Sequence, residues 1–153
     1  DSRVGGFGVV GAFCLLLLVY VSLGGISETY KMIALILMPA LSRWSMVYAI
    51  FAFSYAKPVG LGKTFKEQAN WKKLTLATSL MLASTLGLLI TKGLVLFFVG
   101  LALIFMVWVV AAAVGLFLQR KFAGLTGDSY GAINEVTQVF VLVYFCFVAR
   151  LWC

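Results

Sequence analysis

Five long apolar runs, separated by short polar segments, dominate the chain. They cover approximately residues 7–23, 32–55, 74–90, 94–118 and 131–149. Each is close to the length of about 20 residues that a helix needs to cross a bilayer. Tight turns are expected at Gly24-Gly25 and at Thr91-Lys92-Gly93, so successive runs should be antiparallel neighbours. The pattern predicts an all-α, polytopic membrane helix bundle of about five transmembrane helices, with residues 1–153 forming a single integral membrane domain.

Composition supports a membrane protein whose main partner is the lipid bilayer. Hydrophobic residues make up 63% of the chain and charged residues 11%, and the mean hydropathy is +1.09. A soluble core of this size does not need so much apolar surface. The net charge of +7 is spread between apolar runs rather than clustered with aromatic residues, which argues against nucleic-acid binding. The cysteines Cys14, Cys146 and Cys153 lack C-x-x-C spacing and are interpreted as packing residues.

Basic residues predict how the helices are oriented in the membrane. With five spans, eight lysines and arginines fall on one side and three on the other: Arg3, Lys57, Lys63, Lys66, Lys72, Lys73, Arg120 and Lys121 against Lys31, Lys92 and Arg150. Cytoplasmic loops of membrane proteins carry the excess of basic residues. The first side should therefore face the cytoplasm, across the inner membrane of a prokaryote. Every polar stretch with a functional hypothesis lies on that side.

The polar stretch from Gly124 to Glu135 is the strongest candidate for chemistry. Its oxygen-bearing side chains include those of Thr126, Asp128 and Glu135, and glycines such as Gly127 let the backbone approach a ligand. If a helix begins near Asp128, the seven-residue spacing places Asp128 and Glu135 on one face, about two turns apart. The stretch is either a metal or hydroxyl site, or a polar loop whose Asp128 or Ser129 caps the next helix.

Arg43 lies near the middle of the second apolar run, where a charge costs at least about 2.5 kcal/mol. Two interpretations remain open. Arg43 forms an interhelical ion pair with Glu135, the only acid within a span, or it is a cationic site for a phosphate.

Two further segments on the same side carry positive charge. The glycine-rich turn from Lys57 to Lys66 contains Gly62-Lys63-Thr64, but Lys57 stands where a P-loop requires its first glycine. Its lysines are expected to meet either lipid headgroups or an anionic nucleotide substrate. The charged tripeptide Asp1-Ser2-Arg3 precedes the first span and, taken alone, is typical of an interface anchor.

Taken together, these motifs resemble the cobalamin synthase family, the adenosylcobinamide-GDP ribazoletransferases. The resemblance depends on Asp1-Ser2-Arg3-Val4-Gly5, Arg43, Tyr55-Ala56-Lys57 before Gly60-Leu61-Gly62, and above all Gly124-x-Thr126-Gly127-Asp128 with Glu135. It covers essentially the whole chain, but only the larger C-terminal part of that family's proteins. The family's upstream Asp-Gly-Leu-Ala-Asp type motif is absent, and the chain opens at Asp1. We therefore expect a fragment or a processed chain that works with a missing N-terminal part.

The resemblance implies a magnesium-dependent transfer at the cytoplasmic face. A hydroxyl of α-ribazole, or of its 5′-phosphate, would attack adenosylcobinamide-GDP, release GMP and form adenosylcobalamin or its 5′-phosphate. Such a displacement needs a metal, cations for the phosphoryl oxygens and an acceptor for the hydroxyl proton. The expected roles are Mg²⁺ binding for Asp128 and Asp1, and catalysis for Asp128 and Glu135, unless Glu135 only holds Arg43. Substrate and phosphate binding is expected from Arg3, Arg43, Lys57, Lys63, Gly124, Thr126 and Gly127.

Other functions fit part of the pattern. A CDP-alcohol-type phosphotransferase would use a lipid alcohol as acceptor, but it needs several more aspartates in one helix than this chain shows. A small-solute carrier or a membrane assembly subunit would use Arg43 and Glu135 as an intramembrane pair. Carriers commonly contain inverted repeats, and no paired half-repeat is found here. A homo-oligomer is compatible with any of these functions.

Overall fold

The computed structural model describes residues 6–57 and 60–152, and its described part is all helical apart from connecting segments. The helices are α1 (Gly6–Gly25), α2 (Glu28–Ala52), α3 (Leu61–Glu67), α4 (Trp71–Ile90), α5 (Leu94–Phe122) and α6 (Gly127–Trp152). All except α3 are long and apolar enough to cross a membrane. The predicted fold class, a polytopic membrane bundle with five spans, is confirmed, and the chain is an integral membrane protein.

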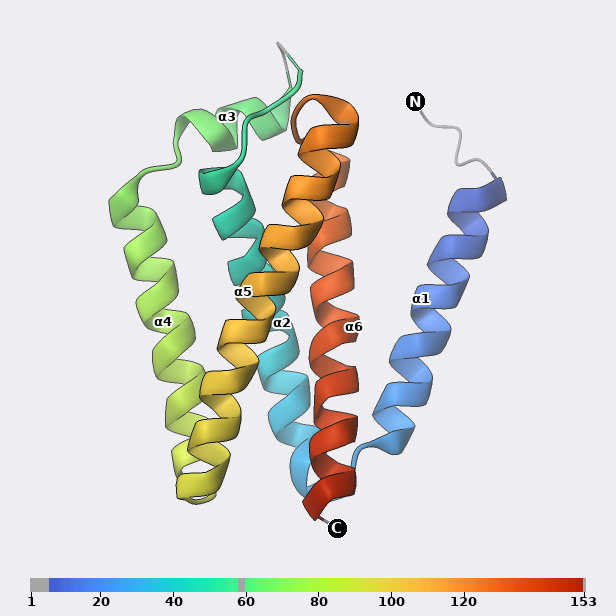
Figure 1. The fold of residues 1–153 in the computed structure, drawn as a ribbon, viewed down its shortest axis with the longest axis vertical. Coiled ribbons are helices and arrows are strands. Elements are labelled where there is room, and N and C mark those ends of the chain that lie inside the picture. The colour runs from blue at the N-terminus through green and yellow to red at the C-terminus, as the bar shows by residue number, and fades with distance from the viewer. Residues whose placement is uncertain (1–5, 58–59, 153) are drawn as a thin grey trace.

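The antiparallel helices α2 and α6 form the centre of the bundle (Figure 1). Helices α4 and α5 lie on one side of this pair, whereas α1 lies on the other side and packs chiefly on α6. Small and hydroxyl residues such as Ser45, Ala49 and Thr137 are fully buried. The Thr137 hydroxyl donates to the Ile133 carbonyl at 2.7 Å, so its polarity is satisfied within its own helix. Such residues allow membrane helices to approach closely.

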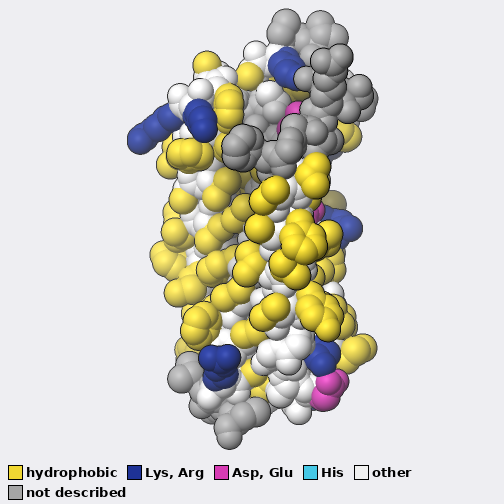
Figure 2. Space-filling view, turned by 90° about the vertical axis from the view of Figure 1, so that its right-hand side faces the viewer, with side chains coloured by type: hydrophobic (Ala, Val, Ile, Leu, Met, Phe, Trp, Pro, Cys, Tyr) yellow, Lys and Arg dark blue, Asp and Glu magenta, His cyan; other side chains and the backbone are white. Residues whose placement is uncertain are grey.

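Figure 2 shows a hydrophobic band with most lysine and arginine side chains gathered near the two ends. Large apolar residues on the outside are expected here because lipid, rather than water, is the surrounding solvent. One end holds the start of α6, the end of α5 and the segment from the end of α2 to the start of α4 (Figure 1). We call it the α6-start end.

Three local predictions were wrong. Helix α1 continues through Gly24 and Gly25, and the turn falls at Ile26-Ser27 instead. Helix α2 ends at Ala52, before the apolar run does, because the following residues pair with the segment before α6. The glycine-rich turn contains α3, which local composition did not indicate. The predicted turn at Thr91–Gly93 is confirmed.

Candidate functional site

Two connections far apart in the sequence are joined by their backbones at the α6-start end. A short parallel bridge pairs Tyr55 with Leu125. The Ala56 N–H donates to the Leu125 carbonyl at 2.9 Å, and the Leu125 N–H donates to the Ser54 carbonyl at 2.8 Å. These bonds satisfy both backbone groups of the buried Leu125. They fix the loop that carries Lys57 beside the start of α6.

Gly124 makes this close pairing possible. Its φ is +146°, which side chains rarely adopt, and a Cβ there would lie 2.8 Å from the Ala56 nitrogen. A residue with a side chain would push the two segments apart. The close approach of the Ala56 backbone therefore explains why a glycine is needed at position 124, and no ligand is required for that explanation. Its predicted role in phosphate binding stays a prediction.

Aromatic residues pack beside the paired segments of Tyr55 and Leu125. The Tyr55 and Tyr130 rings stack with centroids 6.4 Å apart. A Cβ on Gly62 would lie 2.5 Å from the Tyr55 ring, so a side chain there would displace the ring on which α3 rests. The Lys66 ammonium donates to the Phe51 carbonyl at 2.7 Å and so caps the end of α2. Burial lowers the pKa of Lys66 below its ordinary value.

Thr126 caps the start of α6. Its hydroxyl accepts from the Ser129 N–H at 3.4 Å and lies 3.2 Å from the Ser129 hydroxyl. This arrangement satisfies one of the free N–H groups of the first helical turn. The helix therefore begins at Gly127, and Asp128 lies in its first turn with an exposed side chain. The predicted capping residues, Asp128 and Ser129, are therefore wrong: Thr126 caps the helix, and the Asp128 side chain remains exposed.

A groove of about 500 Å³ opens beside this helix start. It brings together a cation, a carboxylate and two hydroxyls from separate parts of the sequence, with apolar walls from the end of α5: Ala56, Lys57, Leu118, Phe122, Thr126, Asp128, Ser129 and Ala132. The N-terminal end of a helix also favours anions through its free N–H groups and its dipole. We call this the α5–α6 groove. Lys57 and the start of α6 give this groove two features that favour a phosphate-bearing group.

Asp128 and Glu135 share one face of α6, as their spacing predicts. Both side chains are exposed, and seven residues of helix separate them by about 10 Å along the axis. Glu135 accepts a hydrogen bond from the Asn134 amide at 3.2 Å. It therefore lies deeper in the span than the groove, on the side of α6 that carries Asp128.

Arg43 lies elsewhere. It lines a separate groove between α2 and α4, together with Trp44 and Ser84. Its guanidinium donates to the Pro39 carbonyl at 3.2 Å. No ion pair joins Arg43 to Glu135 in the described part of the chain, and the neighbours of Arg43 in this groove come from α2 and α4 rather than from α6. The ion-pair interpretation of these two residues is wrong, and the structure does not bring Arg43 to the α5–α6 groove.

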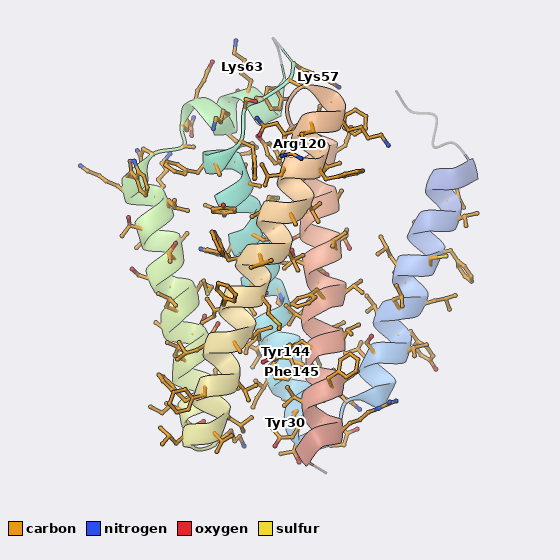
Figure 3. The ribbon with its side chains drawn as sticks, in the orientation of Figure 1. Tyr30, Lys57, Lys63, Arg120, Tyr144 and Phe145 are labelled. Atoms are coloured by element: carbon orange, nitrogen blue, oxygen red, sulfur yellow. The ribbon has the colours of Figure 1, made fainter. Side chains whose placement is uncertain are left out.

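The lysines predicted to bind phosphate separate into two environments. Lys57 lines the groove, whereas Lys63 on α3 lies 3.7 Å from the Glu67 carboxylate. Figure 3 shows both at the same end of the bundle, with Arg120 nearby and Tyr144 and Phe145 far below. Gly127 is exposed at the helix start beside the groove. Asp1 and Arg3 lie outside the described residues.

The apolar walls of the groove were not predicted from the sequence. Leu118 and Phe122 are one turn apart near the end of α5 and Ala132 is one turn after Asp128. The sequence shows this helical spacing, but it does not show that these faces of α5 and α6 lie side by side. It follows from the long-range bridge between Tyr55 and Leu125.

The donors present fit magnesium in part. The groove offers one exposed carboxylate and two hydroxyl oxygens, and Mg²⁺ prefers oxygen ligands while keeping several waters. No group of three acidic, histidine or cysteine side chains converges within the described ranges. Asp128 therefore fits as one protein ligand of an ion whose other ligands come from water, substrate phosphates or other segments.

Comparison with known proteins matches this chain to a family model described as "Cobalamin-5-phosphate synthase", over residues 1–146. A relative from Desulforamulus reducens, named adenosylcobinamide-GDP ribazoletransferase, is 36% identical over 143 residues, covering 93% of this chain and 54% of the relative. Relatives of the same name from Roseiflexus sp. and Thermosynechococcus vestitus are each 35% identical, covering 93% and 95% of this chain and 50% and 55% of their own lengths. The chain spans about half the length of the curated relatives it matches. No solved structure matches it.

Proposed function

The chain belongs to the cobalamin-5-phosphate synthase family, and we propose that it supplies part of the active site of an adenosylcobinamide-GDP ribazoletransferase. The complete protein, meaning these 153 residues together with the part of the family protein that they do not cover, would transfer α-ribazole or its 5′-phosphate onto adenosylcobinamide-GDP. The observation that carries the proposal is the α5–α6 groove, which Lys57 and Asp128 both line at the start of a helix.

The proposed reaction is a displacement at phosphorus. A hydroxyl oxygen of the ribazole forms a bond to the cobinamide-side phosphorus, the bond from that phosphorus to the oxygen of GMP breaks, and the hydroxyl loses its proton. GMP leaves, and adenosylcobalamin or its 5′-phosphate forms. Negative charge spreads over the phosphoryl oxygens during such a transfer, so preorganised cations lower the barrier.

The residues of the groove suit these tasks. Lys57 would neutralise phosphate oxygens, and the N–H groups at the start of α6 would add to the same field. Asp128 would hold Mg²⁺, which when bound supplies charge stabilisation and orients the substrate phosphates. Glu135, about 10 Å further along the same helix face, is proposed to orient the ribazole or accept its proton. Leu118 and Phe122 form an apolar wall on one side of the groove.

Family membership favours this function over the other two classes. A lipid-alcohol phosphotransferase would differ in its acceptor, and a carrier would place its polar residues near the midplane. Here the groove opens at one end of the bundle, where a water-soluble nucleotide substrate has access.

Replacing Lys57 tests whether the groove binds the phosphates. In the complete protein, Lys57→Gln is expected to raise the KM for adenosylcobinamide-GDP by about tenfold, because one charge-assisted phosphate contact is lost. Lys63→Gln is the matched control, because this exposed lysine lies on α3 beside Glu67, and its KM should change less than twofold. Equal effects of the two substitutions, measured by steady-state kinetics in proteoliposomes, would contradict the proposed binding mode.

We propose that the groove faces the cytoplasm of a prokaryotic cell, since the α6-start end carries the excess of basic residues. The test uses single cysteines in a background without native cysteines. On intact spheroplasts, a membrane-impermeant maleimide should label Lys92→Cys at once and Lys63→Cys only after lysis. Both positions are exposed and lie at opposite ends of the bundle. The reverse labelling pattern would overturn the orientation.

A further inference from the structure

Helix α1 leaves most of its surface without a partner among the residues that the structure describes. Only 6% of the residues in this span are buried, against 39% in α6 and 44% in α2. Its contact with α6 is concentrated near its end, where Ser22 is buried and the Cys146 thiol donates to the Ser22 carbonyl at 2.9 Å. Towards its start, α1 diverges from α6 (Figure 1). A side chain at Gly11 would meet nothing within 4 Å.

The face of α6 that contacts α1 continues upward into the candidate site. Positions three or four residues apart form one continuous stripe along a helix. On α6 this stripe consists of Asp128, Ala132, Glu135, Val139, Val143, Cys146 and Arg150. Its lower members Val143, Cys146 and Arg150 line a hollow with Val21 and Ser22 of α1. Its upper members Asp128, Ala132 and Glu135 are exposed.

The matching face of α1 carries small residues in its upper half. Ser22 is buried and Val19 and Leu15 are half-buried on this face, and the same spacing continues towards the start of α1 to Ala12 and Gly8, which are exposed. Small residues four apart let another helix approach closely in a membrane. We call the space between these two faces the α1–α6 wedge, bounded by Gly8, Ala12, Leu15, Asp128, Ala132 and Glu135.

Lipid is a poor occupant for this wedge. Glu135 lies about 12 Å below the start of α6, and an ionised side chain at that depth costs roughly 2.5 kcal/mol or more against hydrocarbon. Figure 2 looks onto the side where α1 lies and shows acidic side chains beside the hydrophobic band. A helix with hydrogen-bonding or basic groups would satisfy the carboxylate, as intramembrane charges require. The relatives carry about as many residues again outside the matched region, which is enough for such helices.

We infer that the α1–α6 wedge is the docking surface for at least one membrane-spanning helix from the part of the complete protein that lies outside these 153 residues. That helix packs against Gly8 and Ala12 of α1 and presents polar groups to Glu135 of α6. The inference rests on the proposed function in one respect, namely that this chain works together with that part. Beyond the proposed function, we identify the surface through which the two parts come together to complete the α5–α6 groove.

Photo-crosslinking in the complete protein tests this surface. A benzoylphenylalanine at Ala12 points into the wedge, whereas one at Leu17, on the opposite side of α1, points outward. On the other wall, Ala132 is matched by Ala102, an exposed alanine of α5. In native membranes, positions 12 and 132 are expected to cross-link to peptides from outside the 153 residues, and positions 17 and 102 to give lipid adducts.

Mass spectrometry of the cross-linked peptides separates the outcomes. Three results would overturn the inference. Lipid adducts at position 12 would show that lipid fills the wedge, and cross-links from position 12 to α6 alone would show that the wedge is closed. Cross-links between two copies of the protein would show that the wedge is a homo-oligomer interface. The Asp128→Asn variant, which is expected to lose activity, should give the same cross-links. If the complete protein shows no transferase activity but the cross-links form, the proposed function is wrong and the docking surface is supported. If the protein is active but the cross-links are missing, only the docking surface is wrong.

Discussion

Replacing Asp128 by Asn in the complete protein is expected to lower turnover by about 10³-fold or more without affecting membrane insertion. The amide keeps the size of the side chain but loses the negative charge that would hold Mg²⁺ in the α5–α6 groove. A bound metal contributes several kcal/mol to the stabilisation of a phosphoryl-transfer transition state, and each 1.36 kcal/mol corresponds to a tenfold change in rate. The measurement is the rate of GMP release in proteoliposomes at saturating Mg²⁺.

The matched control for Asp128→Asn is Glu67→Gln, which removes an exposed acid on α3 outside the groove. Its rate should stay within about twofold of the parent, because surface ion pairs contribute little. A fully active Asp128→Asn protein would remove Asp128 from the metal site. Equal losses in both variants would indicate a general requirement for negative charge at this end of the bundle.

Replacing Gly124 by Val is expected to destabilise the protein by about 3 kcal/mol or more and to abolish activity. The backbone at Gly124 has φ +146°, and a Cβ would lie 2.8 Å from the Ala56 nitrogen and 2.9 Å from its Cα. Forcing a β-branched residue into such a conformation costs of order 1–3 kcal/mol before the clash is counted. The clash would also break the two backbone hydrogen bonds between residues 54–56 and Leu125. Lys57 would then lose its place beside Asp128.

Unfolding by SDS in mixed micelles measures this effect. Gly131→Ala is the control, since a Cβ there meets nothing within 4 Å and the residue lies inside α6. Alanine in a helix interior should leave stability unchanged or raise it by up to about 1 kcal/mol. If Gly124→Val unfolds at the same SDS fraction as the parent, the pairing of the two loops is not what holds the groove together.

The sequence predicted the membrane spans because lipid forces each backbone segment to satisfy its own hydrogen bonds, so long apolar runs become helices. It also predicted the shared face of Asp128 and Glu135, since helical period alone decides that relation. Local pattern could not predict α3, because its glycines and lysines suit a turn equally well. Its position depends on the packing of Gly62 on the Tyr55 ring, which is a tertiary contact.

The composition of the site was predicted better than its assembly. Lys57, Thr126 and Asp128 meet in one groove, but they meet through the backbone bridge of Tyr55 and Leu125, residues 70 positions apart. Arg43 was grouped with them because a charge in a span is usually functional. Its place between α2 and α4 depends on which face of α2 meets α6, and hydropathy does not contain that information.

The most direct measurement follows adenosylcobalamin and GMP in liposomes that contain Mg²⁺, adenosylcobinamide-GDP and α-ribazole. The complete protein is compared with the 153-residue chain alone, and insertion of both is verified. We expect equal amounts of the two products from the complete protein, and none from the 153-residue chain. Correctly inserted complete protein that forms neither product would contradict the transferase assignment, and full activity of the shorter chain would contradict its dependence on the remaining part.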